Sequence, residues 1–84
     1  MPYIFVDIPV EGDWPSPEDM AVRNEITDEL DALNIGEFGG AGGGMGSMDF
    51  SYNVTDAEAA EGTIREMLAK YLPDRDFSIR VTDG

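Results

Sequence analysis

Three segments of the chain alternate apolar and polar residues with a period of two, which is typical of β-strands that rest one face on a core. They cover residues 3–10, 48–54 and 77–81. The apolar positions, which we expect to face the core, are Ile4, Val6, Ile8, Val10, Met48, Phe50, Tyr52, Val54, Phe77, Ile79 and Val81. The opposite face would carry Tyr3, Phe5, Asp7, Asp49, Ser51, Asn53, Ser78, Arg80 and Thr82. The pattern predicts a sheet with one covered face and one open face.

Two other segments repeat apolar residues every three or four positions, the spacing of an amphipathic helix. The first begins at Ser16, an N-cap residue that precedes a proline and two acids, and ends at Asn34 and Gly36. Its predicted apolar stripe consists of Val22, Ile26, Leu30 and Leu33.

The second helix begins with a capping box in which Thr55 is the cap and Glu58 reaches back, and it stops before Pro73. Its predicted stripe consists of Ala57, Ala60, Ile64, Leu68 and Tyr71. We expect Gly62 to allow close packing. Surface ion pairs four residues apart are predicted for Glu61 with Arg65 and for Glu66 with Lys70.

Seven glycines lie between Gly36 and Gly46. We expect a short edge strand at residues 37–38 that the glycines break, followed by a hairpin loop or by a recognition loop that carries Phe38, Met45 and Met48. A phosphate-binding loop does not fit, because Met45 stands where the lysine of a Walker motif would be.

The predicted order of elements is β-α-β-β-α-β. Right-handed crossovers would place both helices on one face of an antiparallel sheet. The chain is therefore expected to be one α+β domain, residues 1–84, with the ferredoxin-like βαββαβ arrangement.

Composition narrows the function classes. The chain has no cysteine and no histidine, so thiolate chemistry, zinc-cysteine sites and histidine bases are excluded. The carboxylates show no EF-hand spacing, and the serines have no histidine base. We expect no enzymatic activity, no cofactor and no metal. Because no apolar run reaches the length of a membrane span and the N-terminus lacks a basic region, we expect a cytoplasmic protein without a membrane contact.

Charge is distributed unevenly along the chain. Eighteen acids and five bases give a net charge of −13. Residues 1–62 hold fourteen of the acids and one base, Arg23, whereas residues 63–84 hold four of each. Such a field would repel nucleic acids and attract basic proteins. The acidity would therefore recruit a basic partner, or it would serve solvation alone.

The stretch from Gly39 to Ala60, in which a glycine-rich turn leads into an acidic strand and a capped helix, resembles a pattern in small, uncharacterised bacterial ferredoxin-like proteins. That resemblance implies a fold and no catalytic residues. In general character the small, acidic, cysteine-free chain is similar to toxin-immunity proteins and anti-CRISPR inhibitors. This likeness implies a nucleic-acid mimic that blocks a nuclease or a CRISPR effector.

The leading hypothesis is thus a non-enzymatic inhibitor of a basic, nucleic-acid-handling protein. The alternative is a halophile or housekeeping domain whose acidity serves solvation, with a homodimer formed through Tyr3 and Phe5 on the open sheet face. The residues expected to contact the basic partner, with Trp14 and Phe38 as apolar anchors, are Glu11, Asp13, Trp14, Glu18, Glu25, Asp28, Glu29, Asp31 and Phe38.

Overall fold

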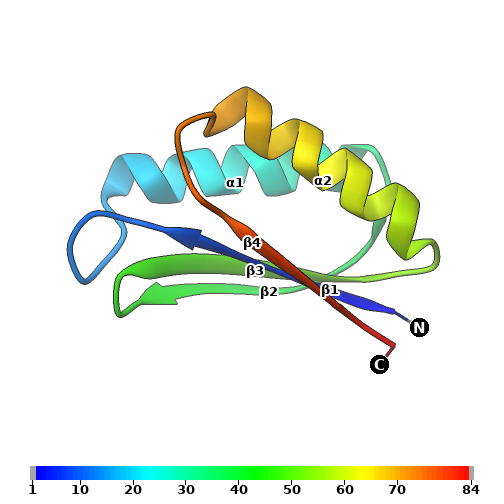
Figure 1. Ribbon diagram of the computed structural model, residues 1–84. Helices are drawn as coiled ribbons and strands as arrows, with labels where there is room; N and C mark the ends of the chain where they lie inside the picture. Colours follow the sequence, from blue (N-terminus) through cyan, green and yellow to red (C-terminus); the bar gives the residue numbers. More distant parts are fainter. Residues whose placement is uncertain (1, 84) are drawn as a thin grey trace.

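The computed structural model describes residues 2–83 and contains four strands and two helices. Their order and bounds are β1 (Tyr3–Pro9), α1 (Pro17–Ala32), β2 (Gly36–Gly44), β3 (Ser47–Val54), α2 (Ala57–Tyr71) and β4 (Ser78–Thr82). Both helices lie on one face of the sheet, and the other face is open (Figure 1).

The sheet has the strand order β2-β3-β1-β4, and every neighbouring pair is antiparallel. β1 and β3 form its centre, where Val6 is paired with Phe50. Each βαβ unit therefore has another strand inserted between its two strands, as the split βαβ arrangement requires. The predicted α+β, ferredoxin-like fold class is confirmed.

The core lies between the central strands and the helices, on the faces that the alternation predicted. Its buried side chains are Ile4, Val6, Ile8, Ile26, Leu30, Met48, Phe50, Tyr52, Val54, Ala60, Ile64, Leu68 and Leu72. Most come from β1, β3 and α2. Val22, Ile79 and Tyr71 pack against this core while only partly buried.

The start of α1 matches the sequence prediction, whereas the start of α2 differs by one residue. Ser16 caps α1 by accepting a 3.1 Å hydrogen bond from the Asp19 N–H, and Asp19 accepts one from the Ser16 N–H. In α2 the N-cap is Asp56, whose side chain accepts from the Ala59 N–H at 3.1 Å. The predicted cap at Thr55 is wrong because the adjacent aspartate makes that hydrogen bond instead.

The glycine-rich segment is an ordered strand. The prediction that glycines break the strand after residue 38 is wrong: β2 pairs with β3 as far as Gly44, and a register shift between Phe38 and Gly40 absorbs one residue. The hairpin ladder supplies the order that glycine propensity lacks. A two-residue turn at Met45 and Gly46 follows, and Met48 is fully buried, so no long recognition loop forms.

Other side chains also depart from the predicted pattern. Leu33 is 55% exposed because it is the C-cap of α1, and Val81 is 40% exposed on the short edge strand β4. Gly62 borders open space and not a close contact. Lys70 contacts Glu29 on the other helix at 3.4 Å, in place of the predicted Glu66.

The residue Ser51 is on the predicted open face, yet it is only 4% exposed. A Cβ atom at Gly39 would lie 2.9 Å from the Ser51 hydroxyl oxygen, and it would also approach the Tyr3 ring at 3.4 Å. β2 therefore packs closely beside this part of β3, which covers the serine.

Candidate functional site

Exposed carboxylates follow one side of α1. Glu18, Glu25 and Asp28 are all exposed and lie seven and three residues apart. At the rise of an α-helix they span about 15 Å along its axis. We call these three residues the acidic helix face.

Two further predicted contact residues of α1 are held by other elements. Glu29 is half-buried and its Oε1 lies 3.4 Å from Lys70 Nζ of α2. The Glu29 carboxylate also raises the pKa of the neighbouring Tyr71 phenol. Asp31 lies toward the sheet, where its Oδ1 accepts a 2.9 Å hydrogen bond from the Tyr52 hydroxyl. The acids of α1 thus diverge, with Glu29 toward α2 and Asp31 toward β3.

The carbonyl end of α1 is unusually acidic. Glu29 and Asp31 lie in its last turn, Asp28 directly precedes them, and no basic residue occurs in that turn. The negative end of a helix dipole disfavours carboxylates at this position. Contacts with Lys70 and Tyr52 offset the cost for Glu29 and Asp31, but Asp28 is exposed. These acids are placed where they do not stabilise the helix.

An apolar tip, Trp14 and Met45, projects from one end of the sheet. Trp14 is 72% exposed and Met45 is 98% exposed. Gly46 joins their two loops, since it donates a 3.1 Å hydrogen bond to the Asp13 carbonyl and accepts a 2.9 Å one from the Val10 N–H. The tip is therefore built on two loops that hold each other in place.

The turn that presents Met45 has an unfavourable conformation for methionine. Met45 has a φ of 55° and Gly46 a φ of 85°, a combination that favours asparagine or glycine at both positions. At Gly44 a Cβ atom would lie 2.9 Å from Cζ3 of Trp14, so the missing side chain leaves room for the indole ring. Strain at an exposed apolar side chain is more common at binding sites than elsewhere.

The remaining predicted contact residues fall into two places. Glu11 and Asp13 are exposed in the loop that carries Trp14, so they bring negative charge close to the tip. Phe38 is 48% exposed and packs edge-on against Tyr52, with ring centroids 5.5 Å apart. Because Phe38 and Trp14 lie toward opposite ends of β2, the structure does not bring the two predicted anchors together.

The open sheet face is partly covered by the chain itself. Tyr3 and Phe5 are half-buried, and the Arg80 guanidinium lies 4.9 Å from the centroid of the Phe5 ring. One row away, Asp7 of β1 stands directly opposite Asp49 of β3. The sequence pattern placed these two carboxylates on the same open face, and the register of the strands pairs them directly.

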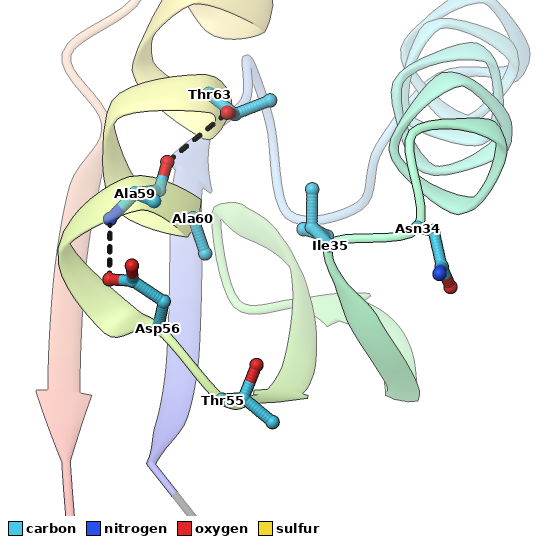
Figure 2. Close-up of a pocket in the computed structure, with 7 residues that line it drawn as sticks. All are labelled: Asn34, Ile35, Thr55, Asp56, Ala59, Ala60 and Thr63. Atoms are coloured by element: carbon cyan, nitrogen blue, oxygen red, sulfur yellow. Dashed lines mark hydrogen bonds between the residues drawn. The ribbon is translucent and has the colours of Figure 1, made fainter.

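A small pocket of about 210 Å³ opens between the end of α1 and the start of α2 (Figure 2). Two of its polar side chains are engaged in α2, since Asp56 accepts from the Ala59 N–H and the Thr63 hydroxyl donates to the Ala59 carbonyl. The Asn34 side chain points away from Thr55 and Asp56. The residues that line this pocket are Asn34, Ile35, Thr55, Asp56, Ala59, Ala60 and Thr63.

A second pocket of about 400 Å³ lies beside Arg75, the residue that fixes the start of α1 to β1. Its guanidinium donates 2.8 Å hydrogen bonds to the Asp19 carboxylate and to the Pro9 carbonyl. Burial opposes ionisation of Asp19, but the hydrogen bonds from Arg75 and Ser16 outweigh it and hold the pKa of Asp19 below its ordinary value. This residue pair is structural, and no sequence pattern indicated it.

Cation and membrane sites are not seen in the described part of the chain. Within residues 2–83, no three carboxylates gather in a way that could hold a metal ion. Neither of the two described helices combines the length and the hydropathy that crossing a membrane demands.

Comparison with known proteins supports the fold alone. No protein-family model matches the chain, and no curated protein matches it. Among solved structures the chain is similar to the crystal structure of protein Atu4242 from Agrobacterium tumefaciens, with a TM-score of 0.65 and 13% identity. The match covers 100% of this chain and 93% of that chain. At this identity the likeness shows a shared α+β architecture.

Proposed function

We propose that this protein is a non-enzymatic binding protein whose acidic helix face occupies a basic surface of a nucleic-acid-handling protein and so excludes nucleic acid from it. The observation that carries the proposal is the acidity of the carbonyl end of α1. There Asp28 is an exposed carboxylate that opposes the helix dipole, whereas Lys70 and Tyr52 offset that cost for Glu29 and Asp31. A residue that breaks a local rule of stability is commonly retained for function.

The distribution of charge favours a partner over solvation. An acidity that served solvation alone would be spread over the whole surface. Here residues 63–84 hold four acids and four bases, so the net charge belongs to residues 1–62. A strongly negative field steers the encounter with a basic protein.

The apolar tip supplies a candidate anchor for such a complex. Tryptophan is enriched among the residues that dominate binding energy. Trp14 and Met45 are held out by hydrogen-bonded loops, which lowers the entropy that binding must remove. The alternative homodimer through Tyr3 and Phe5 is less favoured, because Arg80 already lies over the Phe5 ring.

Affinity capture with charge variants tests this proposal. The native protein is immobilised beside a helix-face triple variant (Glu18→Gln, Glu25→Gln, Asp28→Asn) and a control triple variant (Glu58→Gln, Glu66→Gln, Asp74→Asn). Both triple variants change the net charge equally. Asp31 stays unchanged, because replacing it would also disturb Tyr52.

A lysate freed of nucleic acid is applied, and bound proteins are eluted with KCl or with duplex DNA. We expect basic nucleic-acid-binding proteins on the native and control resins, released by DNA, and their loss from the helix-face variant. Retention of the same proteins by all three resins would show that the acidic helix face is not the binding surface.

A further inference from the structure

Within residues 2–83, no strand pairs with the outer edge of β2, and this edge is nearly free of side chains. β2 stands at the end of the sheet order, so alternate residues turn backbone N–H and C=O groups away from β3. Six of its nine residues are glycine. The segment 38–48 contains neither a charged residue nor a proline, although proteins commonly use both to protect such an edge.

Packing within the chain does not account for all of these glycines. A Cβ atom at Gly36 would overlap the Asn53 carbonyl oxygen, so glycine is required there. At Gly42 a Cβ atom would make only ordinary contacts of 3.6 Å with the Asp49 carboxylate, and φ lies outside the left-handed region. The bare surface at Gly42 is therefore free for a contact from outside the fold.

The strand is held in position from the helix side. Arg23 of α1 donates a 2.8 Å hydrogen bond from Nη1 to the Gly42 carbonyl. Phe38 packs edge-on against Tyr52, which is fully buried. These contacts keep a glycine-rich strand ordered, so its outer edge is pre-organised for pairing.

Negative charge flanks the Phe38 end of this edge. Asp31 accepts a hydrogen bond from the hydroxyl of Tyr52, the residue against which Phe38 packs. Asp28 lies three residues earlier on α1, on the same side of the helix. Glu37 is exposed on β2 itself. A strand that arrived at this edge would thus meet carboxylates from α1 and from β2.

We propose that the outer edge of β2 receives an extended, lysine- or arginine-rich segment of the partner protein as a fifth strand. Backbone hydrogen bonds to β2 supply affinity, and alternate basic side chains of the segment reach Asp28 and Asp31 on the helix side of the sheet. A basic side chain of the other set reaches Glu37, which lies on the opposite face because it pairs with Asn53. Phe38 offers the apolar contact. A second copy of this chain fits poorly, since each copy carries a net charge of −13. This inference rests on the proposed function, because it names how the basic partner docks.

A peptide titration tests strand addition directly. The probe is an acetylated and amidated nine-residue peptide of alternating lysine and valine, added to the ¹⁵N-labelled protein. The control peptide has proline in place of each valine, which keeps the charge but prevents a regular ladder. We expect the valine peptide to shift the amide resonances of residues 38–44 and to slow hydrogen exchange there, and the proline peptide to do neither.

Two charge-matched variants test the charged flank. Asp28→Asn should weaken the valine peptide about two- to fivefold, whereas Glu66→Gln, on an exposed residue of α2, should leave affinity unchanged. Shifts confined to α1, equal binding of both peptides, or a dimer formed through β2 in light scattering would each overturn the strand-addition proposal. The affinity capture tests separately whether the acidic helix face binds a basic protein, because it uses folded partners and the helix-face variant.

Discussion

The Tyr52 hydroxyl donates hydrogen bonds to the Asp31 carboxylate at 2.9 Å and to the Thr27 carbonyl at 3.1 Å, and so joins the sheet to α1 from a fully buried position. Burial and the Asp31 charge raise the pKa of Tyr52 well above its ordinary range, so the phenol stays protonated and remains a donor. An acid of the candidate surface is thereby fixed by the core.

Replacing this phenol tests that connection. Tyr52→Phe keeps the ring but removes the hydrogen bond that the single hydroxyl hydrogen shares between the charged Asp31 carboxylate and the Thr27 carbonyl. The free energy of unfolding should therefore fall by about 1–3 kcal/mol. Urea denaturation measures the change. Tyr71→Phe, on a partly exposed ring, is the control and should lower stability less. Equal losses in the two variants would contradict a special role for the Tyr52 hydroxyl.

The stability of the protein should depend on pH through the ionisation of the Asp19 carboxylate. Its pKa is lower in the folded chain than its ordinary value of 3.8, so its contribution to stability is fully present above that value. The contribution is lost as pH falls from 3.8 through the folded pKa. Asp19→Asn should therefore lower the melting temperature at pH 7. In strong acid the melting temperatures of the variant and the native protein should lie closer together. A constant difference across this range would contradict the ion pair with Arg75.

An exposed ion pair on α2 provides a comparison for the loss of stability expected in Asp19→Asn. Glu61 and Arg65 lie 2.9 Å apart on α2, but their side chains are 35% and 53% exposed. The Asp19 and Arg75 side chains are only 13% and 30% exposed. Glu61→Gln should accordingly change stability less than Asp19→Asn, because solvent screens the exposed pair.

The facing carboxylates of Asp7 and Asp49 predict a stabilising substitution. Like charges directly opposite on neighbouring strands are destabilising. Asp7→Asn should raise the free energy of unfolding by about 0.2–1 kcal/mol at low salt, with a smaller gain in salt that screens the repulsion. Asp83→Asn changes the net charge equally and serves as control. A loss of stability in Asp7→Asn would show that this carboxylate has another structural role.

The single tryptophan reports the charge around the apolar tip. Trp14 is 72% exposed and directly follows the exposed acids Glu11 and Asp13 in the same loop. A negative field concentrates cations and repels anions. Caesium should therefore quench the fluorescence of Trp14 more strongly than iodide, relative to free N-acetyltryptophanamide. Glu11→Gln with Asp13→Asn should reduce that preference, and equal quenching by both ions in the native protein would contradict an acidic surround.

Alternation and helical spacing were sufficient to predict the strands and helices that bury side chains in the core. Ile4, Val6 and Ile8 occupy the core because a strand with one covered face has only one place for them. The extent of β2 beyond Phe38 was missed because glycine has no side chain to show a period. The choice of Asp56 over Thr55 as N-cap depends on backbone angles that neighbouring polar residues do not reveal.

The candidate site was predictable only in part. Helical periodicity placed Glu25 and Asp28 on the outside of α1, and both are exposed. It could not show that Asp31 is held by Tyr52, since that contact joins residues 21 positions apart. Nor could it show that Arg23 donates a hydrogen bond to the Gly42 carbonyl, 19 positions away. Long-range contacts of single side chains leave no local pattern in a sequence.

The dissociation constant of the captured partner, measured for the native protein and for the two triple variants, tests most directly whether the acidic helix face is the binding surface. If the acidic helix face binds a basic surface, the helix-face variant should bind about tenfold more weakly or worse, and its affinity should vary less with salt. The control variant should stay within about twofold of native. Equal dissociation constants for the two triple variants would contradict the account.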